Sequence, residues 1–125
     1  MSTISSTLAD ALQNSDAVGA LITKVIPGMN FDLQDSALAE SPYACIMVIR
    51  LPWTEQPYVG GGYHERGQVE VRCVSKVSED AVNALAIVAA DVVKANVSTT
   101  ALNHHPDVDL EQKIWFDEMT VDYLA

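Results

Sequence analysis

The chain of 125 residues has few basic residues, few aromatic residues and only two cysteines. Seven basic residues against seventeen acidic ones give a net charge of −10. This charge repels phosphate backbones and argues against binding to nucleic acid or to an anionic membrane. Cys45 and Cys73 both lie in apolar segments, so they indicate buried thiols in a reducing compartment rather than a disulfide framework.

The sequence also has no long apolar run. No segment approaches the roughly 20 apolar residues that span a bilayer. The first residues carry neither the basic region nor the continuous apolar core of a signal peptide, so we expect a soluble intracellular protein. Hydrophobic residues make up 49% of the chain, which is typical of a folded protein. The length suits one domain, which we assign to residues 1–125.

Hydrophobic periodicity predicts the elements of the N-terminal half. Apolar residues at helical spacing predict a helix over residues 3–14 and a further helical turn or two that ends at Pro27 and Gly28. Residues 29–42 have no clean period and predict an irregular connection. Residues 43–51 are almost all apolar and rich in β-branched residues, which predicts a strand covered on both faces and ended by Pro52.

The C-terminal half carries equally clear patterns. Residues 67–75 alternate apolar and polar side chains, which predicts a half-buried strand that forms a hairpin with the previous one through a long loop. Ser78 caps a predicted helix over residues 78–95, with acidic residues in its first turn. Residues 97–111 predict a second irregular connection, and residues 113–125 a long terminal strand.

Together these elements predict an α+β fold, in which a mainly antiparallel sheet of about four strands carries two main helices on one face. The helix after Ser78 is apolar over more of its circumference than one sheet contact requires. A subunit of a symmetric assembly would bury this surplus between protomers, and a monomer with an apolar surface patch accounts for it equally well.

The segment PYVGGGYHERG, residues 57–67, is the most distinctive of the sequence. A phosphate-binding loop requires a lysine and a hydroxyl residue after its glycines and then a helix, and this segment leads into a predicted strand without either. His64 has no second histidine four residues later, so the two-histidine helix face of a zinc protease cannot form. The segment therefore predicts the tip of a hairpin.

Other candidate chemistry is weak. Two histidines and three carboxylates lie in residues 104–111, but adjacent histidines of an extended chain point to opposite sides, which favours a polar surface loop over a metal site. The serines lack a nucleophile elbow, and apolar surroundings raise the pKa of a thiol. The carboxylates are scattered, so spacing nominates no acid/base pair. The sequence predicts a protein that is not an enzyme, without catalytic, cofactor-binding or metal-ligating residues.

The layout of the chain resembles the tail terminator proteins of long-tailed bacteriophages, which are also called minor tail protein U-like or tail completion proteins. The resemblance covers most of the chain and lies in its hydrophobic pattern. It follows an opening helix, the apolar strand SPYACIMVIRL, the alternating strand RGQVEVRCVS, the helix SEDAVNALAIVAADVVKA and the final strand WFDEMTVDYLA.

The resemblance implies a structural virion protein, assembled in the host cytoplasm. It would form a ring of six copies at the head-proximal end of the tail tube, where it ends tube polymerisation and joins the head connector. The implied partners are other copies of the chain, the tail tube protein and the connector or neck protein. DNA would pass through the acidic lumen without specific binding.

The resemblance also implies that the loop between the two central strands, residues 52–67, projects and contacts a partner. The candidate contact residues are Tyr58, Gly60, Gly61, Gly62, Tyr63, His64, Glu65 and Arg66. Two alternatives stay open: a head-completion or connector neck protein of the same particle, and a small intracellular α+β enzyme.

Overall fold

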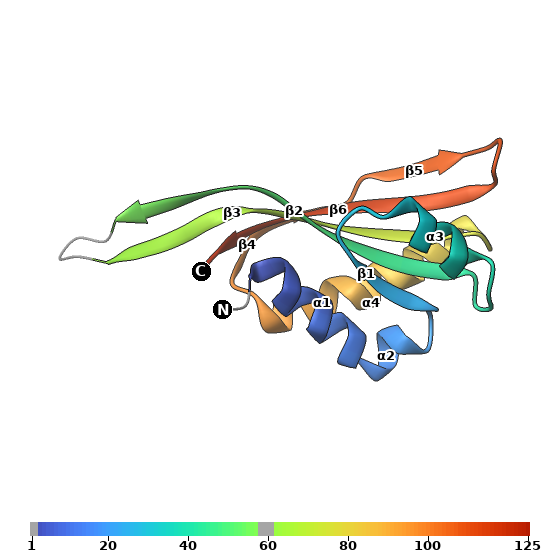
Figure 1. Cartoon of the computed structure of the whole chain (residues 1–125), viewed down its shortest axis with the longest axis horizontal. Coiled ribbons are helices and arrows are strands. Elements are labelled where there is room, and N and C mark those ends of the chain that lie inside the picture. The colour runs from blue at the N-terminus through green and yellow to red at the C-terminus, as the bar shows by residue number, and fades with distance from the viewer. Residues whose placement is uncertain (1–2, 58–61) are drawn as a thin grey trace.

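The computed structural model describes residues 3–57 and 62–125, and within them the chain forms a mixed α/β fold around one six-stranded sheet (Figure 1). The strand order is β1-β2-β3-β6-β4, and β5 also pairs with β6. Among these strands β1 and β2 pair in parallel, whereas the other pairs are antiparallel. The strands are β1 (Lys24–Pro27), β2 (Ala44–Pro57), β3 (Tyr63–Ser75), β4 (Thr99–Asn103), β5 (Pro106–Asp109) and β6 (Ile114–Leu124).

Helices cover both faces of this sheet (Figure 1). The helices of the described residues are α1 (Ile4–Asn14), α2 (Asp16–Gly19), α3 (Phe31–Leu38) and α4 (Glu79–Asn96). Each begins after a polar side chain that accepts a hydrogen bond from a backbone N–H of the first turn; these caps are Thr3, Ser15, Asn30 and Ser78. Figure 1 shows α1, α2 and α4 on one side of the sheet and α3 on the other.

Two hydrophobic cores follow from this arrangement. The larger core lies between the sheet and the helices α1 and α4, and includes Leu8, Leu12, Leu85 and Met119. The smaller core lies under α3 and includes Met47. Alternate residues of the first part of β2 enter different cores, which is why residues 44–49 are apolar throughout.

Several sequence predictions are confirmed. Helices occur where residues 3–14 and 78–95 predicted them, and strands where residues 43–51, 67–75 and 113–125 did. The cysteines are buried free thiols. Cys45 lies in the smaller core and Cys73 in the larger one, on opposite faces of the sheet.

The prediction of about four strands and two helices on one face is only roughly matched. The expected helical turns before Pro27 are matched only in part: α2 forms over Asp16–Gly19, but the segment then continues as β1, whose Val25 and Ile26 enter different cores. The connection over residues 29–42 is not irregular, since it contains α3. Residues 97–111 are likewise not irregular, because they hold β4 and β5.

Pro52 does not end β2, which was predicted to stop there. The strand continues to Pro57 through a β-bulge: Arg50 pairs with Val69 and Trp53 with Gly67, so β2 carries one extra residue between these pairs. A proline is tolerated at a bulge because the ladder requires no N–H there. The predicted long loop is therefore largely two paired strands.

Candidate functional site: a projecting arm and an acidic groove

A two-stranded arm extends beyond the sheet (Figure 1). We define the arm as residues 53–57 of β2 and 63–67 of β3, which pair from Trp53 with Gly67 to Pro57 with Tyr63. The neighbouring strands end near its base. The strand β1 pairs with β2 up to Val48, and the pairing of β6 with β3 begins at Arg66. The arm is thus held in place by its base.

The base of the arm is anchored through the carboxylate of Glu65. One guanidinium nitrogen of Arg50 lies 2.9 Å from Oε1 of Glu65, and the hydroxyl of Tyr123 donates a 2.6 Å hydrogen bond to Oε2. The Arg50 guanidinium also lies 3.6 Å from the ring centroid of Trp53, a cation–π contact. These four residues, which we call the arm anchor, join the arm to the last residues of β6.

The backbone reinforces this anchor. The N–H of Glu65 donates to the carbonyl of Ala125 at 2.9 Å, and the N–H of Ala125 donates to the carbonyl of Glu65 at 2.8 Å. Gly67 lies directly opposite Trp53 on the neighbouring strand, and a Cβ at this glycine would be 2.5 Å from the Trp53 Cβ. A side chain at position 67 is therefore excluded by the close approach of the two strands.

The anchor changes the acidity of Tyr123. Burial, and then the hydrogen bond to the negatively charged Glu65, raise the pKa of Tyr123 to about 12. The phenol is therefore the hydrogen-bond donor at neutral pH, as its contact with a carboxylate requires.

The predicted contact residues fall into two groups. Tyr58, Gly60 and Gly61 lie outside the described residues. The described ones are Gly62, with a φ of +81°, Tyr63 and His64, which pair with Pro57 and Gln56, the exposed Arg66, and Glu65 of the anchor. Glu65 thus has an internal role, while partner contact through this segment stays a prediction.

The segment 104–111 does not gather its polar side chains around one point. Nδ1 of His104 lies 2.9 Å from Oδ2 of the buried Asp117, a residue of β6 that the sequence analysis did not select. The three carboxylates of the segment lie in or beside the hairpin formed by β5 and β6. Among the described residues, no group of three or more histidine, cysteine, aspartate or glutamate side chains has the arrangement of a metal site.

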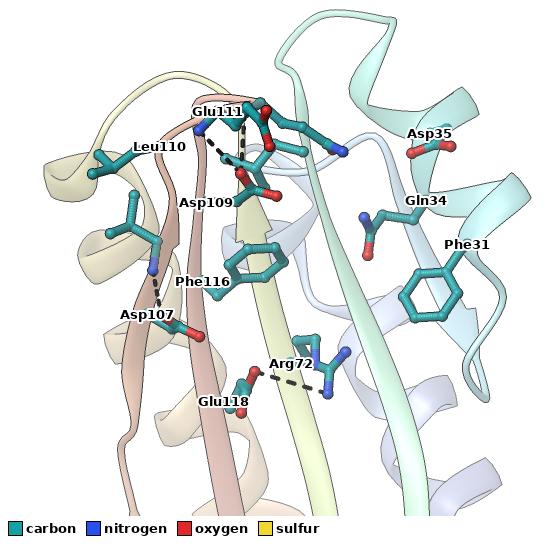
Figure 2. Close-up of a pocket in the computed structure, with 13 residues that line it drawn as sticks. Phe31, Gln34, Asp35, Arg72, Asp107, Asp109, Leu110, Glu111, Phe116 and Glu118 are labelled. Atoms are coloured by element: carbon teal, nitrogen blue, oxygen red, sulfur yellow. Dashed lines mark hydrogen bonds and ion pairs between the residues drawn. The ribbon is translucent and has the colours of Figure 1, made fainter.

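A groove of about 820 Å³ opens on the face of the sheet that carries α3 (Figure 2). One wall is α3, which contributes Phe31, Gln34 and Asp35. The opposite wall is the β5–β6 hairpin, and the floor includes Arg72 of β3 and Phe116 of β6. Five carboxylates line the groove, namely Asp35, Asp107, Asp109, Glu111 and Glu118.

The groove was missed at the sequence level, because its walls come from segments predicted to be irregular. Asn30 and Asp32 are a cap and a first-turn acid that could have revealed α3. The arm anchor was also missed, since pairing Arg50 with Glu65 requires a strand that continues past Pro52.

The fold has a counterpart in a virion. The chain superposes on a chain of the solved structure "Virion of native gene transfer agent (GTA) particle" with a TM-score of 0.59, over 98% of this chain and 95% of that one. Sequence identity is 10%, so the likeness establishes a shared fold. No family model matches the sequence, and no curated protein matches it.

Within residues 3–57 and 62–125, no helix is long and apolar enough to cross a membrane.

Proposed function

We propose that the protein is a structural component of a virion, and that it forms the ring that ends the tail tube of a long-tailed phage or a phage-like particle. The observation that carries the proposal is the likeness in fold, over nearly the full length of both chains, to a chain of a gene transfer agent virion. The layout of the sequence, which resembles tail terminators, supplies the finer assignment.

Two features of the molecule support an assembly role. The arm extends from the sheet and is held by its own anchor residues (Figure 1). It can therefore reach a neighbouring copy without any movement of core residues. In a cyclic ring each copy uses one surface to contact the next copy and a different surface to contact the previous one, and a projecting element suits such a head-to-tail contact. On this proposal the arm contacts the adjacent subunit or the tube.

The net charge of −10 suits a ring around a DNA path. Acidic side chains repel the phosphate backbone, so DNA can slide through a lumen without adhering to it. The proposed partners are the other copies of the chain in a ring of six, the tail tube protein on one side of the ring and the connector or neck protein on the other.

A polymerisation assay tests this function. The tail tube protein from the same particle is polymerised with and without this protein, and tube lengths are measured by electron microscopy. We expect the protein to stop elongation at substoichiometric amounts and to appear as a ring at one tube end. Elongation that continues at saturating protein, with no ring at either end, would contradict the proposal.

A further inference from the structure

We propose that the acidic groove binds a basic peptide segment of another protein, in which lysine or arginine side chains flank an apolar residue. The inference goes beyond the proposed ring and does not depend on it. It rests on the charge of the groove, on a buried amide directed into it and on the aromatic side chains that line it.

The charge of the groove is strongly unbalanced. Arg72 is the basic residue that faces its five carboxylates. This arginine is already neutralised, because its guanidinium lies 2.9 Å from Oε2 of Glu70 and 3.9 Å from Oε1 of Glu118. Lys76 lies in an adjoining hollow beside Asp35 and leaves the balance negative. The groove therefore attracts cations.

The carboxylates differ in how far the protein already uses them. Oδ1 of Asp109 accepts the N–H groups of Glu111 and Gln112, both at 3.1 Å, and so holds the turn of the hairpin. Oδ1 of Asp107 accepts the N–H of Val108 at 2.8 Å. The carboxylate groups of Asp35 and Glu111 have no hydrogen bond or ion pair with any described residue. They stand on opposite walls and are available to a ligand (Figure 2).

Gln34 provides an observation that is independent of charge. Its side chain is only 6% exposed, and Oε1 has no hydrogen-bond partner among the described residues. Figure 2 shows the amide extending from α3 toward the groove. A buried amide oxygen without a partner destabilises the unliganded protein, and a ligand N–H can satisfy it.

Aromatic side chains also line the groove, which distinguishes a peptide from a simple cation. Phe31 of α3 is 54% exposed, and Phe116 lies on the floor. These side chains would cover an apolar residue of a bound segment while the carboxylates bind the flanking basic groups.

A second copy of this chain does not fit this description. Its exposed basic residues are at least ten positions apart in the sequence, at Lys24, Arg66, Lys76, Lys94 and Lys113. No segment of the chain therefore presents two neighbouring exposed lysines or arginines. The occupant is a segment of a different, more basic protein.

The test uses fluorescein-labelled hexapeptides with two Lys or Arg residues on each side of a Leu-Phe, Phe-Leu or Leu-Leu pair. Affinity is measured by fluorescence anisotropy at physiological salt. We expect saturable binding that is about tenfold tighter than that of the same peptides with a Ser-Ser pair. Equal binding of both sets, or of free spermidine, would show attraction to charge alone and overturn the proposal, as would the absence of saturable binding.

Matched variants locate the binding. Asp35→Asn with Glu111→Gln should weaken it about tenfold, whereas Asp10→Asn with Asp91→Asn, which changes net charge equally on the opposite side of the sheet, should alter it less than about twofold. Similarly, Phe31→Ser should weaken binding several-fold and Ile87→Ser, at an exposed position of α4, should not. Equal losses in the groove and control variants would place the binding elsewhere.

Gln34→Met separates a ligand-binding role from a structural one. It removes the unpartnered amide, so we expect a higher melting temperature together with weaker peptide binding. A lower melting temperature with unchanged affinity would assign Gln34 to the fold alone and remove the amide from the proposed site.

Discussion

At the scale of single residues, the arm depends on a few side chains that no local sequence motif marks. Glu65 accepts from both Arg50 and Tyr123, and Arg50 in turn stacks on Trp53. These contacts join residues that are up to 73 positions apart in the sequence, from Arg50 to Tyr123. Sequence analysis placed Glu65 in a contact segment, but its carboxylate is occupied within the molecule.

Gly67→Ala tests the close approach of the two arm strands. The added Cβ meets Cβ and Cα of Trp53 at 2.5 and 2.9 Å, and the backbone atom cannot move aside cheaply. We expect a loss of about 2 kcal/mol in the free energy of unfolding, measured by urea denaturation. Gly19→Ala is the matched control, because nothing lies within 4 Å of its Cβ, and should change stability by less than about 0.5 kcal/mol.

Because of Tyr123, the free energy of unfolding should fall as the pH rises through the alkaline range. An unfolded tyrosine ionises near pH 10, whereas the folded Tyr123 has a pKa of about 12. Its contribution is therefore complete below pH 10 and is lost as the pH rises from 10 toward 12. The stability difference between wild type and Tyr123→Phe, measured by urea denaturation across this range, should shrink in the same interval. A difference independent of pH would show that Tyr123 ionises normally in the fold.

At the scale of elements, the sequence determines the long amphipathic segments and leaves the short ones to tertiary contacts. The helix after Ser78 and the strand after Lys113 are long enough for their periods to be recognised. Four residues of β1 cannot show a period, and the apolar spacing before Pro27 matches a helix equally well. The parallel pairing with β2 makes this segment a strand rather than a helix. The groove could not be predicted, because it exists only once α3 and the β5–β6 hairpin have packed on the same face.

The arm is separable from the core, which a loop replacement tests. Pro57 pairs with Tyr63, so replacing residues 58–62 by Asn-Gly closes the arm with a two-residue turn. We expect the free energy of unfolding to stay within about 0.5 kcal/mol of wild type, because no core residue changes. If the protein caps tail tubes as proposed, capping should be impaired, since the proposed contact segment is removed. Loss of the fold would show that the loop is structural, and normal capping would show that it contacts no partner.

The reactivity of the two cysteines measures how accessible the core on each face of the sheet is. Burial raises the pKa of Cys45 to about 12 and that of Cys73 still further. We therefore expect both thiols to react with dithionitrobenzoate at pH 8 only after denaturation in guanidinium. Rapid reaction of either thiol in the folded protein would indicate that its core opens readily.

At the scale of the whole molecule, the fold, the arm and the acidic charge are consistent with one subunit of a ring around a DNA path. The surplus apolar surface predicted for α4 is smaller than expected, because Ala90 is buried and Val88 packs against the larger core. Ile87 stays 64% exposed on this helix. A ring contact would more naturally involve the arm than the helix.

The most direct test of the central claim is the position of the protein in dissected particles. Head-free tails and tail-free heads are purified separately, and the copies of this chain per particle are counted by quantitative mass spectrometry. The proposed function predicts about six copies on each head-free tail and none on tail-free heads. Copies on the heads alone would identify a neck protein, and absence from both would contradict a structural role in the virion.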